Sequence, residues 1–173
     1  LAGNVGYCAS KSAVHNLTRM LAFEWAKHGI NVNAIGPSVI FTPGMKAALP
    51  PPSRRGLVLI DPSYEIKSDY PRVVAALKDG LKSFATGTYL VWLPFLPTIE
   101  ARALPGKLKK LPADWLYASL SVRGPATKGH GMHGSAMFVV NPPWTLKAAL
   151  EESLPWLTNL LALDEMAGWQ IQT

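Results

Sequence analysis

The sequence predicts an α/β fold with a largely parallel sheet flanked by helices. Apolar runs of strand length alternate with segments whose apolar residues recur every three or four positions, the spacing of one helical face. The run Leu57-Val58-Leu59-Ile60 is apolar at consecutive positions, which is typical of a strand buried on both faces of a parallel sheet. With 173 residues, 49% of them hydrophobic, the chain can bury one core but is too short for two enzymes.

The first part of the chain predicts one helix and one strand. Between residues 9 and 28 the apolar side chains recur at helical spacing: Val14, Leu17, Leu21 and Trp25. Gly29 can end this helix in the left-handed conformation. Residues 31–35 follow as a short strand.

Proline separates this first part from the rest, because none of the 15 prolines precedes Pro37 and four fall between residues 43 and 52. Beyond them we expect strands at 57–60, 88–93, 115–122, 136–140 and 169–172, with a glycine-rich loop at 123–134. Helices are expected to begin at Pro71, to span 98–110 with a break at Pro105-Gly106, and to span 146–161 with a bend at Pro155.

Composition restricts the function classes. Lys and Arg number 17 against 11 Asp and Glu, and the net charge of +6 favours a partner that carries phosphate. The single cysteine, Cys8, excludes an internal disulfide framework and fits a reducing, cytoplasmic location. The longest apolar stretch, residues 89–97, is shorter than the ~20 residues of a membrane helix, so no membrane span is expected.

Two further features bear on completeness and on metals. The chain begins at Leu1 without an initiator methionine, so we expect the natural start to be missing. His130 and His133 are three residues apart, but the glycines around them disfavour a helix that would bring both to one metal. We predict no metal site.

Tyr7 and Lys11 form the first candidate catalytic pair. On a helix they lie one turn apart, so the ammonium can approach the phenol and favour tyrosinate, the form that acts as a base. Two surface neighbours with no catalytic role are the commoner explanation of such a spacing.

The surrounding residues 7–14, 21–24, 29–35 and 42–45 resemble the short-chain dehydrogenase/reductase family, over about residues 1–46. The resemblance implies that Tyr7 donates a proton, that Lys11 binds the ribose, and that an NAD(P) nicotinamide lies against three residues: Pro37, Ile40 and Thr42. The glycine-rich dinucleotide loop and the catalytic serine of that family have no counterpart here.

Asp61, Pro62 and Tyr64 form the second candidate site, because they follow a buried strand at the edge where α/β proteins bind ligands. A carboxylate and a backbone carbonyl can accept hydrogen bonds from an exocyclic amine, which localises its lone pair for attack on a methyl sulfonium. The aromatic ring of Tyr64 could stack on a flipped-out base. The alternative is an ordinary strand-to-turn junction.

Residues 49–62, together with 64–65, 69–70, 84–87, 139–144 and 154–157, closely resemble the RlmJ family, over about residues 47–173. The resemblance implies a Rossmann-like, S-adenosylmethionine-dependent methyltransferase acting on adenine N6 of large-subunit ribosomal RNA. It implies that Asp61 is catalytic and that Pro62 and Tyr64 complete the adenine site. Ser63 replaces a proline of the family, which makes the loop less pre-organised and predicts weakened activity.

Three further sets of residues are weighed beside this site. Arg54 and Arg55 precede the strand and are candidate contacts for ribosomal RNA phosphates, as is the lysine cluster at 107–110, although solvated surface charge is commoner. The segment Asn141-Pro142-Pro143-Trp144 fits the general pattern of amino-methyltransferases, but we favour a structural role for it.

We therefore expect an incomplete α/β protein in which residues 1–46 are a dehydrogenase-like fragment and residues 47–173 are the carboxyl-terminal portion of a methyltransferase. The family's amino-terminal half, which holds the methyl donor, has no counterpart here. Two alternatives stay open, an NAD(P)-dependent short-chain oxidoreductase and a non-catalytic basic module that binds RNA.

Overall fold

A computed structural model of the chain describes residues 5–29, 31–35, 49–51, 54–125 and 132–173, and of residues 5–11, 31 and 33–35 the backbone only. Within these ranges the elements follow one another as α1 (Val5–Ala26), β1 (Asn31–Ile35), β2 (Gly56–Ile60), α3 (Asp69–Ser83), β3 (Thr88–Pro94), α4 (Ile99–Leu108), β4 (Trp115–Ser121), β5 (Gly134–Val140), α5 (Leu146–Leu161) and β6 (Gly168–Gln172). The α/β class predicted from the sequence is confirmed.

The strands form one six-stranded sheet in the order β1-β2-β3-β5-β4-β6. β1 pairs with β2 and β2 with β3 in parallel, whereas the other three pairings are antiparallel. The expectation of a largely parallel sheet is therefore not confirmed. The reason is that β4 and β5 are joined by a loop, and two strands joined without a crossover element pair antiparallel. β5 thereby lies between β3 and β4, two strands that point in the same direction.

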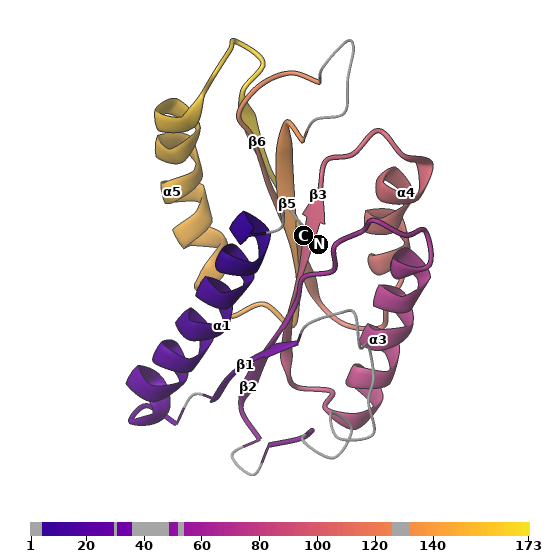
Figure 1. Ribbon diagram of the computed structural model, residues 1–173. Coiled ribbons are helices and arrows are strands. Elements are labelled where there is room, and N and C mark those ends of the chain that lie inside the picture. The colour runs from indigo at the N-terminus through magenta and orange to yellow at the C-terminus, as the bar shows by residue number, and fades with distance from the viewer. Residues whose placement is uncertain (1–4, 30, 36–48, 52–53, 126–131) are drawn as a thin grey trace.

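Helices cover both faces of this sheet (Figure 1). In that view α1 and α5 lie on one side, while α3 and α4 lie on the other. The larger core cluster joins β2, β3, β4 and β5 to α3 and α4 through residues such as Val91, Phe138, Leu77 and Leu108. A smaller cluster around Leu116 and Leu154 joins the sheet to α5.

Two details of the helices differ from expectation. α4 continues through Pro105 to Leu108, so the predicted break at Pro105-Gly106 is wrong. Pro105 lacks an N–H, but its carbonyl still accepts a bond of 3.0 Å from the Lys109 N–H, which keeps the last turn helical. On α1, Leu17 and Phe23 are 58% and 82% exposed, so its apolar residues are not buried as one stripe.

Candidate functional site

Asp61 and Pro62 lie at the carboxyl end of β2. This strand is paired in parallel on both sides, with Ile60 opposite Ile35 of β1 and opposite Val91 of β3. Pro62 is fully buried and Asp61 is half-buried. Ser63, the next residue along the chain, is exposed. The carboxyl ends of parallel strands form the ligand-binding edge of an α/β sheet, and Asp61 is placed at that edge as the sequence predicts.

Tyr64 holds the loop after β2 against the next strand. Its backbone adopts a φ of 55°, and its hydroxyl donates a 2.8 Å hydrogen bond to the carbonyl of Trp92 in β3. The ring is only 5% exposed, with its centroid 4.9 Å from that of Tyr70 and 6.4 Å from that of Trp92. Burial raises the pKa of Tyr64 above its ordinary value, so the hydroxyl stays a neutral donor.

In this structure, therefore, Tyr64 is enclosed by two aromatic neighbours, and its predicted stacking on a base stays a prediction. What the geometry shows is a positioning role. The hydroxyl connects the turn that contains Asp61 and Pro62 to β3 by a hydrogen bond.

Arg54 and Arg55 are close to Asp61 in sequence but not in space. They precede β2 and Asp61 follows it, so the whole strand separates them, about 16 Å at ~3.3 Å per residue. Both arginines are exposed. Arg54 has a φ of 51°, and its N–H donates to the Pro51 carbonyl at 2.8 Å in a turn that leads into the strand. The structure therefore places the two arginines at the edge of the sheet opposite the candidate site.

Asn141 lies at the same far edge, at the end of β5. Its Nδ2 donates to the carbonyls of Ala85 at 2.7 Å and Gly87 at 2.8 Å, and its backbone N–H donates to the backbone carbonyl of Asp114 at 2.8 Å. The Thr88 hydroxyl donates in turn to the Asn141 carbonyl at 3.0 Å. These bonds fasten the turn between α3 and β3 to the end of β5. Asn141 thus makes structural contacts, and the role favoured for the whole segment stays a prediction.

The dehydrogenase-like candidates lie largely beyond what can be described. Tyr7 and Lys11 are both on α1, one turn apart along its backbone, with side chains outside the described set. Pro37, Ile40 and Thr42 lie outside the described residues altogether. Their roles stay predictions.

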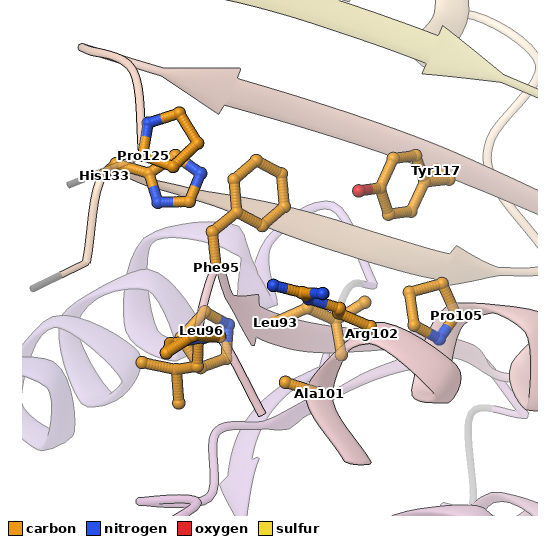
Figure 2. Close-up of a pocket in the computed structure, with 11 residues that line it drawn as sticks. Leu93, Phe95, Leu96, Ala101, Arg102, Pro105, Tyr117, Pro125 and His133 are labelled. Carbon is orange, nitrogen blue, oxygen red and sulfur yellow. The ribbon is translucent and has the colours of Figure 1, made fainter. Parts of the chain in front are cut away.

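Sequence reasoning missed a cavity of about 380 Å³ at the end of β3 (Figure 2). Its walls come from α4, from β4, from the segment that follows β3 and from the residue that precedes β5. The lining includes Phe95, Arg102, Tyr117, Pro125 and His133. The signal available in the sequence was the run Leu93-Pro94-Phe95-Leu96-Pro97, which ends β3 and leaves the sheet at the same edge as Asp61.

The described residues hold neither a metal-binding cluster nor a membrane-spanning helix. They contain no group of three or more His, Cys, Asp or Glu side chains placed to hold a metal ion. None of the helices in these ranges is long and apolar enough to cross a membrane.

Comparison with known proteins divides the chain in two. A family model described as "Ribosomal RNA large subunit methyltransferase D, RlmJ" matches residues 41–172, and one described as "short chain dehydrogenase" matches residues 1–52. The two matches meet where the sequence predicted a join between fragments.

Individual relatives show the same division. Ribosomal RNA large subunit methyltransferase J of Haemophilus influenzae is 44% identical over 132 residues, which cover 74% of this chain and 46% of that protein. An NAD-dependent glycerol dehydrogenase of Listeria innocua is 59% identical over 39 residues, 22% of this chain and 15% of that protein. The chain thus spans about half the length of the curated methyltransferase that it matches.

A solved structure shares the fold. The crystal structure of protein LPL1258 from Legionella pneumophila superposes with a TM-score of 0.67 at 29% sequence identity, covering 75% of this chain and 47% of that one.

Proposed function

Because the chain belongs to the RlmJ family, we propose that it carries the acceptor side of an S-adenosylmethionine-dependent methyltransferase acting on adenine N6 of large-subunit ribosomal RNA. The observation that carries the proposal is the position of Asp61 and Pro62 at the carboxyl end of β2, between two parallel neighbours. This edge is where an α/β sheet presents groups to a ligand.

The proposed chemistry follows from the lone pair of the amine. In adenine, the N6 lone pair is delocalised into the ring and is a poor nucleophile. If the Asp61 carboxylate and the Pro62 carbonyl accept hydrogen bonds from the two N6 hydrogens, the lone pair is localised on nitrogen. Asp61 then accepts the proton that the nitrogen loses after methylation. The base must leave its stack to reach this edge.

The protein's contribution is to hold these acceptors still. Pro62 is fully buried and has a fixed φ, and the Tyr64 hydroxyl fastens the turn to β3. Ser63 is exposed and less constrained than the proline of the family, so we expect a lower rate than a turn with two prolines would give. We also retain the proposal that Tyr64 completes the adenine site, which requires its ring to turn out from between Tyr70 and Trp92.

The methyl donor is a separate matter. S-adenosylmethionine, when bound, supplies the methyl group on its sulfonium. An α/β sheet holds such a nucleotide at the end of the strand beside the catalytic one, on a turn with several glycines. Here that strand is β1, and it is followed by Gly36, Pro37 and Ser38, with a single glycine. The residues present do not fit a complete donor site, and we assign none of them to it.

Ribosomal RNA is the proposed partner, and the cytoplasm is the proposed location. The net charge of +6 favours a polyanion, and Arg54 and Arg55 are exposed cations. Since these arginines lie about one strand length from Asp61, we propose that they contact RNA phosphates remote from the target base.

The two alternatives predict different experiments. An NAD(P)-dependent oxidoreductase is favoured by the match at residues 1–52, and it predicts that NADPH fluorescence changes when the chain is added. A non-catalytic RNA-binding module predicts RNA affinity that falls with salt, together with no methyl transfer at all.

The methyltransferase proposal is tested with labelled S-adenosylmethionine and large-subunit ribosomal RNA that lacks the modification. Because the donor site is incomplete, we expect label to be incorporated only slowly and only at high S-adenosylmethionine concentration, and we expect Asp61→Ala to abolish that incorporation. Label that never reaches the RNA, or that reaches it equally with Asp61→Ala, would reject the proposal.

A further inference from the structure

The cavity of about 380 Å³ at the end of β3 lies next to the proposed methyl-transfer edge. β3 is the parallel neighbour of β2, and the residues that follow each strand emerge at the same edge of the sheet. The two places are joined directly, because the Tyr64 hydroxyl after β2 bonds the carbonyl of Trp92, two residues before Pro94 of the cavity wall. A ligand in the cavity would therefore lie one strand away from Asp61.

The walls of the cavity are apolar and stiff. Four prolines contribute to the lining, and their rings restrict the backbone around it. Phe95 and His133 lie together on one side, with ring centroids 5.4 Å apart and planes inclined at 44° (Figure 2). The volume falls within the range of about 300–1,000 Å³ that is usual for small-molecule sites. Such walls fit a flat, rigid ring.

Positive charge accompanies these walls. Figure 2 shows the Arg102 guanidinium between Phe95 and Tyr117, and no carboxylate of the described residues pairs with it. The Lys109 ammonium lies 5.7 Å from the centroid of the Tyr117 ring. The lining contains no Asp or Glu. An anion is therefore attracted, and a cationic ligand is not.

Tyr117 adds a hydrogen-bonding group. Its hydroxyl points toward Phe95 in Figure 2, and the residue is 9% exposed. Burial raises the pKa of this phenol, and a hydrogen bond with the Ser119 side chain opposes that rise only in part, so the hydroxyl stays neutral. With Ser119 as one partner, a hydroxyl can still make a further hydrogen bond to a ligand.

We propose that the cavity binds a nucleotide of the RNA substrate next to the target adenosine, with its base against Phe95 and its phosphate on Arg102. The proposal rests on the proposed function for the identity of the substrate. The base of a nucleotide supplies the planar apolar ring and the edge groups that Tyr117 can bond, and its phosphate supplies the negative charge that Arg102 lacks among its neighbours. Holding the neighbouring nucleotide would anchor the strand while the adenosine is turned out toward Asp61.

The test measures binding without any methyl donor, so that it is independent of turnover. Adenosine 5′-monophosphate, adenosine and ribose 5-phosphate are titrated into the full 173-residue chain, with binding followed by NMR. We expect the monophosphate to bind most tightly of the three. Arg102→Gln should weaken its binding by roughly tenfold or more, as loss of a charged hydrogen bond implies, and should leave adenosine unaffected. Phe95→Leu should weaken both adenosine and the monophosphate.

Arg72→Gln is the matched control, because Arg72 is an exposed arginine on α3 that pairs with Asp69 at 3.8 Å. The proposal is overturned if the monophosphate does not bind. It is also overturned if Arg102→Gln and Phe95→Leu change the affinity for the monophosphate no more than Arg72→Gln does. Ribose 5-phosphate that binds as tightly as the monophosphate also overturns it, because the base would then contribute nothing.

Failure of the proposed function is distinguishable from this result. Asp61→Asn should leave the affinity for the monophosphate unchanged while removing methyl transfer. If methyl transfer is absent but the cavity variants still weaken nucleotide binding, the cavity assignment stands and the methyltransferase proposal falls. The final arm uses a short single-stranded RNA as competitor, which should displace the monophosphate from the wild-type chain. An RNA that leaves the monophosphate bound overturns the assignment to RNA.

Discussion

Replacing Asn141 by alanine is expected to lower the free energy of unfolding by about 3 kcal/mol. The Asn141 side chain donates to the carbonyls of Ala85 at 2.7 Å and Gly87 at 2.8 Å, and so joins the end of β5 to the turn before β3. Its backbone also has a φ of 51°, a conformation that asparagine tolerates better than alanine does.

The magnitude combines these two effects. Each neutral hydrogen bond contributes about 1 kcal/mol, so the lost pair accounts for about 2 kcal/mol. Alanine in the left-handed region adds a cost of about 1 kcal/mol. Glycine at Asn141 removes the same two bonds but accepts the positive φ, so Asn141→Gly should cost only about 2 kcal/mol before its own chain entropy is counted.

Urea denaturation followed by tryptophan fluorescence measures both variants. Asn159→Ala is the control, because Asn159 is exposed on α5 and its replacement should change the free energy of unfolding by less than about 0.5 kcal/mol. The reasoning is refuted if Asn141→Ala costs no more than Asn159→Ala. It is refuted in its second part if Asn141→Gly is less stable than Asn141→Ala, because a positive φ requires the opposite order.

Three further predictions concern the helices. A Cβ added at Gly80 would lie 2.8 Å from Cε1 of the buried Tyr89, so Gly80→Ala should cost about 1–3 kcal/mol, and an unchanged thermal midpoint would contradict this. A Cβ at Gly106, inside α4, meets no atom within 4 Å, so Gly106→Ala should stabilise the chain by about 0.5–1 kcal/mol, and a lower midpoint would count against it. The Lys67 ammonium bonds the Glu100 carboxylate at 2.9 Å and lowers the pKa of Glu100. Because the folded pKa is the lower one, this contribution to stability is present above the ordinary pKa and is lost as pH falls. Lys67→Ala should raise the pKa of Glu100 in an NMR titration, and an unmoved pKa would exclude the pairing.

The sequence predicted the elements well because each depends on its own residues. The run Leu57–Ile60 lies in strand β2, and Asp61 follows its carboxyl end as that run alone predicts. Pairing depends instead on residues far apart in the chain. Nothing local in residues 134–140 indicates that β5 pairs with β3 on one side and β4 on the other. The parallel character of the sheet was therefore overestimated.

The same contrast between local and long-range information explains why only some features of the candidate site could be predicted from the sequence. Asp61 and Pro62 needed only one strand to be placed, whereas the sequence predicts Arg54 and Arg55 as contacts for RNA phosphates without placing them relative to Asp61. Because β2 lies between Arg55 and Asp61, residues that are close in sequence stand at opposite ends of the strand. The cavity joins Phe95 to His133, 38 positions later, and no periodicity connects two such residues.

Nucleoside analysis by mass spectrometry of ribosomal RNA incubated with S-adenosylmethionine and the chain tests most directly the claim that Asp61 is the acceptor for the adenine amine. Asp61→Asn is compared with Asp79→Asn, a control on α3 whose carboxylate pairs with Lys82 at 3.7 Å on the surface. The account predicts N6-methyladenosine from the wild-type chain and from Asp79→Asn, and none from Asp61→Asn. Methylation that is absent from the wild-type chain, falls on another nucleoside, or survives Asp61→Asn would contradict it.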